Sequence, residues 1–268
     1  MARAMSVASG AMQRLLDIMD RLRDPGGCPW DREQTLRSLT PYLLEEAHEV
    51  IEAIEAGDAA HHKEELGDLL FQVVFQSRIA REEGKFDFAQ VCDAISAKLT
   101  RRHPHVFGEV SVSGSREVVQ NWERIKAEER REKGLAERSA IGGVPVSLPA
   151  LVRAERLTEK AAAVGFDWPD AKAVMAKVRE ELSELEQTLE HGGALEIEHE
   201  LGDLIFAVAN LGRFVKVHPE EALRATLRRF EARFHYIEAQ LRERGKSPRE
   251  SNLAEMDALW DEAKGSVG

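Results

Sequence analysis

Two acidic segments occur twice in the chain, with the same spacing in both copies. "EEAHE" at residues 45–49 recurs as "EELSE" at residues 180–184, and "EELGDLLFQVV" at residues 64–74 recurs as "HELGDLIFAVA" at residues 199–209. Every matched pair of positions is 135 residues apart, from 45 and 180 to 74 and 209. Self-similarity at a fixed offset indicates a structural unit that the chain uses more than once. We therefore expect two copies of one helical unit.

Apolar residues recur along the chain at spacings of three and four, which is the period of a helix buried on one face. In the first half of the chain the pattern predicts helices at residues 12–22, 41–56, 61–83, 88–102 and 116–133. In the second half it predicts helical structure from 151 to 215, with breaks at 165–169 and 192–193. A long helix at 219–245 and a short one around Trp260 are expected to follow. Thr40 is expected to cap the second helix, with Pro41 in its first position. "HPHVFGEVSVSGS" is expected to be a loop with slight strand character. The sequence predicts an all-α chain.

A segment rich in Gly and Pro separates the two copies. "GLAERSAIGGVPVSLPA" at residues 134–150 is weakly periodic, so we interpret it as a linker. It divides a first repeat at residues 1–133 from a second repeat at residues 151–268. The acidic helices of each repeat also carry apolar faces that need covering. This favours four-helix-bundle-type cores, built from both repeats or across the subunits of a homodimer.

Charge and composition argue against several classes of function. The formal net charge is −11 over 268 residues, which argues against binding to nucleic acid or to an anionic membrane, because phosphate would be repelled. Cys28 and Cys92 lie far apart and form no metal-ligand motif, as is typical of the reducing cytosol. The sequence shows no signal peptide and no apolar run of membrane-spanning length. A cytoplasmic location is therefore expected.

The duplicated carboxylates are the strongest candidates for chemistry. Glu46 and Glu49 are three residues apart, so they project to one side of their helix. Glu65 and Asp68 form a second such pair in the next helix. A short link makes the two helices antiparallel neighbours, and four like charges would then converge, which is costly unless a cation neutralises them. Carboxylates alone suit Mg²⁺ or Mn²⁺. The equivalent set in the second repeat is Glu181, Glu184, Glu200 and Asp203.

A solvated surface is the alternative interpretation, and a single Glu-x-x-Glu pair would favour it. The repetition of both pairs at identical spacing favours a metal site instead. Basic and aromatic residues after each acidic hairpin could bind a nucleotide, because cations clamp phosphate oxygens and a Trp face can stack on a base. These residues are Lys98, Arg102, Trp122 and Lys126 in the first repeat, and Arg229, Arg233 and Trp260 in the second. Each Trp fits equally well as a core residue.

Several motifs, in their order, resemble those of the MazG nucleoside triphosphate pyrophosphohydrolases. They are "CPWDREQT", "YLLEEAHEV", "EELGDLLFQVVF", "KLTRRHPHVFGE", "NWERIKAEER" and, at the entry to the second repeat, "SLPALVRAERLTEKAAAVGFDW". The resemblance implies an all-α pyrophosphatase fold with tandem repeats. It also implies Mg²⁺-dependent hydrolysis of NTPs and dNTPs to monophosphates and pyrophosphate. By motif position, the eight carboxylates match metal ligands, and Lys98, Arg102, Arg229 and Arg233 match phosphate-contacting residues. "RRHPHVFGE" has no counterpart in the second repeat.

Hydrolysis would proceed by attack of water on the α-phosphorus, with metal ions neutralising the triphosphate and aligning the water. Glu49 or Glu184 could orient or deprotonate that water. Two other classes stay open. One is a non-catalytic nucleotide-binding or interaction module. The other is a ferritin-like di-iron protein, whose Glu-x-x-His pairs match Glu45 and His48 but find Ser183 in the second repeat. The expected partners are nucleoside triphosphates and a second copy of the chain.

Overall fold

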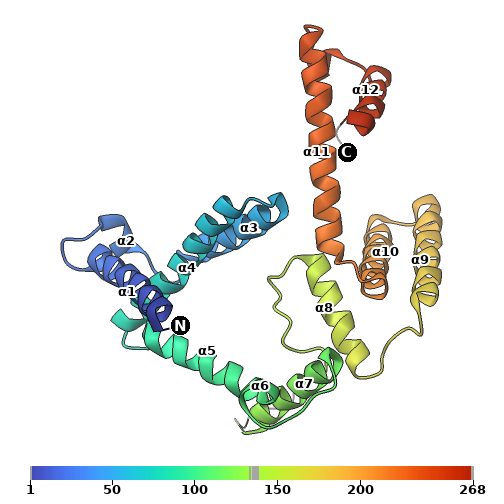
Figure 1. Ribbon diagram of the computed structural model, residues 1–268. Coiled ribbons are helices and arrows are strands. Elements are labelled where there is room, and N and C mark those ends of the chain that lie inside the picture. The colour runs from blue at the N-terminus through green and yellow to red at the C-terminus, as the bar shows by residue number, and fades with distance from the viewer. Residues whose placement is uncertain (1, 133, 135–138, 267–268) are drawn as a thin grey trace. The chain divides into compact units, whose positions relative to one another are not determined.

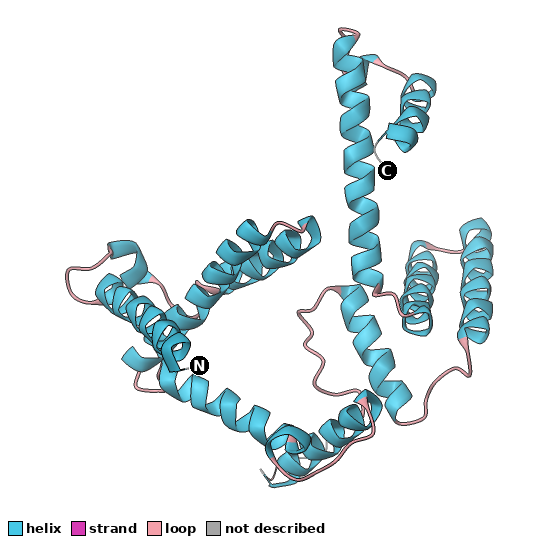
Figure 2. Ribbon diagram, viewed as in Figure 1, coloured by secondary structure: helices cyan, strands magenta, loops and turns pink. Residues whose placement is uncertain are grey.

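Helices form throughout the chain, as the spacing of its apolar residues predicts. The computed structural model describes residues 2–132, 134 and 139–266, and contains no strand among them (Figure 1 and Figure 2). The all-α prediction is confirmed. The chain divides into two units, Met1–Leu135 and Ala136–Gly268. Among the described helices, none is long and apolar enough to cross a membrane.

A helical hairpin lies at the centre of the first unit. Its arms are α3 (Thr40–Ala56) and α4 (Ala59–Glu82), which pack along each other. Gly57 ends α3 with a φ of 70°, in the left-handed region that favours glycine. Asp58 then caps α4, because its carboxylate accepts two backbone N–H groups of the first turn. The sequence "AGDA" therefore makes the tight reversal that places the two acidic helices side by side.

A third helix covers one side of this hairpin. α1 (Ala2–Arg23) packs against α4, and the buried side chains of the contact region are Met19, Leu39, Val74, Phe75 and Ile79. Ion pairs lie at the edge of this core. Arg78 of α4 binds Asp20 of α1 at 2.8 Å. Arg23 of α1 binds Glu82 of α4 at 2.7 Å.

Four further helices lie among the described residues of the first unit. They are α2 (Pro29–Glu33), α5 (Phe88–Arg102), α6 (Pro104–Phe107) and α7 (Ser115–Glu132). α2 contacts α1, whereas α5 contacts α4, α6 and α7. Asp87 starts α5 with a capping box, in which its carboxylate and the side chain at the third helical position each accept a backbone N–H.

The second unit repeats the hairpin with a covering helix. Its elements are α8 (Ala150–Ala163), α9 (Ala171–His191), α10 (Ala194–Val215), α11 (Pro219–Glu243), η1 (Pro248–Glu250) and α12 (Leu253–Ser266). α9 packs on α10 and α8 covers α10, as α1 covers α4 in the first unit. α12 folds back along the long helix α11 (Figure 1). The buried residues between α11 and α12 are Ile237, Leu241 and Leu259.

Five local predictions were wrong. The first helix, α1, begins at Ala2 and not at residue 12. Leu39, and not Thr40, is the residue that precedes α3, and no side chain caps that end. α4 begins at Ala59, two residues before the predicted start, because Asp58 caps it. The segment after α5 that we expected to be a loop contains the short helix α6 and no strand among its residues. Pro29–Glu33 forms a helix within an expected break, with its Pro at the first helical position, where no N–H is needed.

The boundary between the units falls after Leu135, within the segment 134–150 that we interpret as a linker. Residues 139–149 form turns and irregular backbone without a helix. Residues 133 and 135–138 lie outside the described residues. The division into two repeats joined by a linker stays a prediction.

Candidate active site

Each hairpin brings three carboxylates together from its two helices. In the α3–α4 cluster, Glu46 and Glu49 of α3 meet Glu65 of α4, with one oxygen of each within 4.8 Å of the others. The same arrangement forms the α9–α10 cluster, whose members are Glu181, Glu184 and Glu200. The two predicted aspartates, Asp68 and Asp203, are exposed and lie outside these tight groups. Six predicted ligands are therefore clustered in the structure, three in each unit.

Like charges raise the energy of the α3–α4 cluster. The pKa of Glu46 is raised because partial burial disfavours its charged form, and because Asp68 and the nearby glutamates carry the same charge. Asp68 thus acts on the cluster even though it lies outside the 4.8 Å group. Nε2 of His61 lies 2.9 Å from the carboxylate of Glu65, within hydrogen-bond distance.

A lysine partly neutralises the α9–α10 cluster. Lys177, one turn before Glu181 on α9, lies 2.7 Å from its carboxylate and also binds Glu180. Both contacts raise the pKa of Lys177, which therefore stays charged. Glu184 is exposed, yet its pKa is raised, first by loss of hydration and then by the neighbouring glutamates, against the opposing charge of Lys177.

The donor sets of both clusters fit a divalent cation. All three donors in each cluster are carboxylates, the ligands that Mg²⁺ and Mn²⁺ prefer. The pKa values of Glu46 and Glu184 are raised first by loss of hydration, and repulsion from the neighbouring carboxylates adds to the effect. A doubly charged ion at the centre of either cluster would relieve this repulsion.

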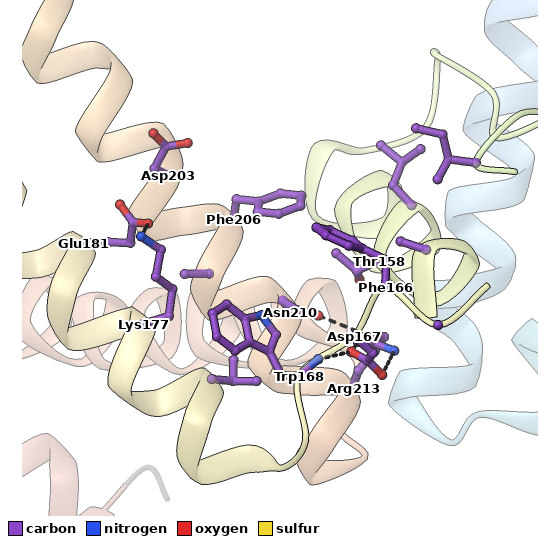
Figure 3. A pocket seen from close by; sticks show the side chains of 16 residues that line it. Thr158, Phe166, Asp167, Trp168, Lys177, Glu181, Asp203, Phe206, Asn210 and Arg213 are labelled. Atoms are coloured by element: carbon purple, nitrogen blue, oxygen red, sulfur yellow. Dashed lines mark hydrogen bonds and ion pairs between the residues drawn. The ribbon is translucent and has the colours of Figure 1, made fainter. Parts of the chain in front are cut away.

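A cavity of about 610 Å³ opens beside the α9–α10 cluster (Figure 3). Residues of α8, α9 and α10 line it, together with the "GFDW" segment at residues 165–168 that joins α8 to α9. Glu181, Lys177 and Asp203 lie at one end. Its aromatic lining residues are Phe166, Trp168 and Phe206. The size and apolar lining are typical of a site for a small organic molecule.

The opposite end of the cavity is built from an ion pair and a buried amide. Arg213 of α10 binds the carboxylate of Asp167, with Nη2 at 2.5 Å from one oxygen and Nη1 at 3.4 Å from the other. Nε of the same guanidinium donates to Oδ1 of Asn210 at 3.1 Å. Asp167 also accepts the backbone N–H of Trp168 at 2.9 Å. These bonds hold the 165–168 segment against α10, where it forms a wall of the cavity.

The first unit fills the equivalent space with core side chains. Phe75 stands 135 residues before Asn210 and is completely buried, with 0% exposure. Gln72 stands in the same relation to Ala207 and is also buried. A cavity of only about 20 Å³ lies between α1 and α4. The two copies of the repeat therefore share the carboxylates, but only the second copy has a large cavity beside them among the described residues.

The predicted substrate-binding residues of the first unit lie on α5 and α7. Arg102 binds Glu129 of α7 at 2.6 Å. Together with the preceding arginine it lowers the pKa of Glu129 to about 2. Lys98 is exposed on α5, whereas Lys126 on α7 is half-buried. The ring of Trp122 packs against a histidine, with centroids 5.8 Å apart. Arg102 would have to exchange its carboxylate partner for a phosphate to bind substrate.

The predicted substrate-binding residues of the second unit lie on α11 and α12, and none of them lines the cavity. The guanidinium of Arg233 lies over the ring of Trp260, 5.5 Å from its centroid. Trp260 packs against the core between α11 and α12. Arg229 donates to Thr226 at 2.9 Å. The core interpretation thus accounts for the position of Trp260, and a substrate-binding role for all three residues stays a prediction.

The structure adds four candidate residues that the sequence did not predict: Lys177, Asn210, Asp167 and Arg213. The repeat itself contains a signal for Asn210, because an amide stands there where the first copy has Phe75 in an otherwise matching apolar stretch. Nothing in the sequence "GFDW" shows that it forms the wall of a cavity. That role depends on how α8 packs against α10.

Comparisons with known proteins identify relatives of this chain. The family model described as "MazG nucleotide pyrophosphohydrolase domain" matches residues 34–107. A nucleoside triphosphate pyrophosphohydrolase of Escherichia coli K12 is 46% identical over 256 residues, which cover 94% of this chain and 97% of that protein. A protein of Thermotoga maritima named nucleoside triphosphate pyrophosphohydrolase/pyrophosphatase MazG is 44% identical over 261 residues, or 97% and 98% of the two chains. The Bacillus subtilis protein YabN is 45% identical over 252 residues, covering 92% of this chain and 50% of YabN.

Proposed function

Because the chain belongs to the MazG family of nucleotide pyrophosphohydrolases, we propose that it hydrolyses nucleoside triphosphates to nucleoside monophosphates and pyrophosphate. It is an enzyme that acts on acid anhydrides. One observation of the structure carries the proposal furthest. A cluster of three carboxylates stands at one end of a cavity whose volume and aromatic lining suit a nucleoside.

A magnesium or manganese ion is the cofactor proposed for the α9–α10 cluster. Glu181, Glu184 and Glu200 would hold it, with Asp203 beside them at the same end of the cavity. When bound, such an ion neutralises phosphate charge and lowers the pKa of a bound water. Lys177 supplies a cation at the same end, where its ammonium can donate to a phosphate oxygen.

Glu184 is the residue best suited to accept a proton from the attacking water. Its raised pKa makes it a stronger base than an ordinary glutamate, and its exposure gives water access. Attack at the α-phosphorus breaks the bond to the oxygen that bridges the α- and β-phosphorus atoms, so pyrophosphate leaves as one group. Glu49 occupies the equivalent position in the α3–α4 cluster.

We place turnover in the second unit. The nucleoside would lie against the aromatic side chains of the cavity, with its triphosphate directed at the α9–α10 cluster. In the first unit the buried side chains of Phe75 and Gln72 occupy the equivalent positions. The α3–α4 cluster is therefore proposed to bind a cation without a comparable site for the nucleoside.

We also propose that the enzyme is a homodimer. Both hairpins expose large apolar side chains at equivalent positions, Leu66 and Val73 on α4, and Leu201 and Val208 on α10. A hairpin that packs by such a face against a second hairpin makes a four-helix bundle. Packing between two copies of the chain would remove these faces from water.

Product analysis tests the proposed reaction. The purified protein is incubated with NTPs and dNTPs, with Mg²⁺ and with a chelator, and pyrophosphate is resolved from orthophosphate. We expect pyrophosphate and monophosphate in the presence of Mg²⁺ and no turnover with the chelator. Release of orthophosphate and diphosphate would contradict the proposed bond cleavage.

A further inference from the structure

Asn210 has hydrogen-bond donors that the protein itself does not use. It lies on α10, lines the cavity and is only 7% exposed. Its Oδ1 accepts from Nε of Arg213. Because a guanidinium can only donate, this bond fixes which end of the amide is the oxygen. The amide nitrogen has no hydrogen-bond partner among the described residues, and it is not among their fully enclosed atoms.

The polar groups beside Asn210 are already engaged. The hydroxyl of Thr158 bonds to two backbone carbonyls of its own helix, at 3.0 Å and 2.9 Å. Both carboxylate oxygens of Asp167 accept from Arg213, and one of them also accepts a backbone N–H. A ligand at this end therefore meets a buried amide whose NH2 group can donate two hydrogen bonds. No existing hydrogen bond of that group has to break first. An unpaired donor in a partly dry site costs free energy until a ligand satisfies it.

The position of Asn210 in the cavity is that of a base-binding residue. Glu181 and Asp203 stand at one end, and Asn210 stands beside Trp168 toward the Asp167–Arg213 pair (Figure 3). The base and the phosphates lie at opposite ends of a nucleoside triphosphate. When the triphosphate faces the carboxylates, the base edge is directed at the amide.

We propose that Asn210 determines base specificity by donating a hydrogen bond to a carbonyl oxygen on the edge of the base. The inference rests on the proposed function and deepens it. Uracil, thymine, guanine and hypoxanthine present such an oxygen, whereas adenine and cytosine present an amino group at the matching position. A donor facing an amino group leaves both groups unpaired, and a site built to bond a polar group discriminates strongly against an analogue that cannot complete the bond. Arg213 is the positioning residue that holds the amide in this orientation.

Two matched substrate pairs measure the preference, ITP against ATP and UTP against CTP, because the carbonyl and amino forms of each pair have nearly the same shape. We expect kcat/KM for pyrophosphate release to favour the carbonyl form about tenfold in both pairs. The dissociation constants of the α,β-methylene analogues, measured by calorimetry, should show the same ratio without any turnover. If no nucleotide is hydrolysed, the proposed function fails, and the analogue affinities still decide the role of Asn210.

Three variants make the test specific to the amide. Asn210→Asp keeps the shape but presents acceptors, so the preference should invert toward ATP and CTP. Asn210→Leu removes the hydrogen bond, so both ratios should fall to about one. Asn252→Asp makes the same chemical change at the start of α12, where Asp caps as well as Asn, and should keep the wild-type ratios. Equal wild-type affinity for both members of each pair, or an unchanged preference in folded Asn210→Asp, would overturn the proposal.

Discussion

At the scale of single residues, the α9–α10 cluster depends on its counter-charge. Glu181 is buried within 4.8 Å of two other carboxylates, and Lys177 is the cation bound to it. A buried charge without a partner is strongly unfavourable. The contact with Lys177, one helical turn away, therefore offsets part of the cost of holding these carboxylates together.

Lys177→Met should make the folded protein depend on metal. The substitution keeps the apolar stem and removes the ammonium, so Glu181 loses its partner. We expect the free energy of unfolding without metal to fall by about 1–3 kcal/mol, and saturating Mg²⁺ to raise the melting temperature more than it does in the wild type. Scanning calorimetry with Mg²⁺ and with a chelator measures both effects. Lys172→Met, on the exposed side of the same helix, is the control. Equal Mg²⁺ stabilisation of both variants would contradict the account.

At the scale of helices, ion pairs fasten the covering helix of the first unit to its hairpin. Glu82 on α4 accepts from Arg23 of α1 at 2.9 Å and 2.7 Å, and from Arg78 at 2.8 Å. Arg23 and Arg78 lower the pKa of Glu82 from an ordinary 4.5 to about 2, against the opposing effect of burial. A lowered pKa in the folded state means that the ionised carboxylate stabilises the fold.

Glu82→Gln should destabilise the first unit in a pH-dependent way. The contribution of the carboxylate is fully present above pH 4.5 and is lost as the pH falls toward 2. The variant should therefore be less stable than wild type at pH 7, with a difference that narrows through pH 4 and 3. Urea unfolding at a series of pH values measures this. Glu83→Gln, which removes an exposed pair with Lys85, should change stability little at any pH. A difference for Glu82→Gln that does not depend on pH would be inconsistent with the ion pairs.

The sequence predicted what depends on local spacing. The helix period is local, so the all-α fold and the pairing of Glu46 with Glu49 on one helix face could be predicted directly. The repeat could also be predicted, because the two copies match within the sequence itself. The cavity could not be predicted from the sequence, because it arises from contacts between elements that are distant along the chain. Asn210 stands in the cavity only because α8 and the 165–168 segment pack around it, whereas Phe75 fills its counterpart. The start of α3 was missed because its capping residue is an apolar Leu39.

At the scale of the whole molecule, exposed apolar faces predict association. Ile205 lies on α10 with Leu201 four residues before it and Val208 three residues after it, so the three share one helix face, and all are about half-exposed. The first unit repeats two of these positions, as Leu66 and Val73 on α4. Apolar patches of this kind on two helices mark interaction sites.

Ile205→Lys should disrupt the proposed homodimer. A charged side chain at the centre of the apolar face would be buried without a partner in the bundle. We expect light scattering to show a dimer for the wild type and a monomer for the variant at micromolar concentration, with unchanged helical circular dichroism. Val146→Lys, at a position that is 81% exposed and outside the helices, should remain dimeric. A monomeric wild type would show that the two hairpins of one chain cover each other or stay exposed.

We propose that the α9–α10 cluster performs Mg²⁺-dependent release of pyrophosphate. The most direct measurement is kcat/KM for pyrophosphate release by two matched variants, Glu184→Gln and Glu49→Gln, which make the same change at equivalent positions of the two clusters. Neither carboxylate forms an ion pair among the described residues, so both folds should survive. We expect Glu184→Gln to lose about 100-fold or more in kcat/KM and Glu49→Gln to stay within about threefold of wild type. Near-wild-type turnover by folded Glu184→Gln would contradict the proposal.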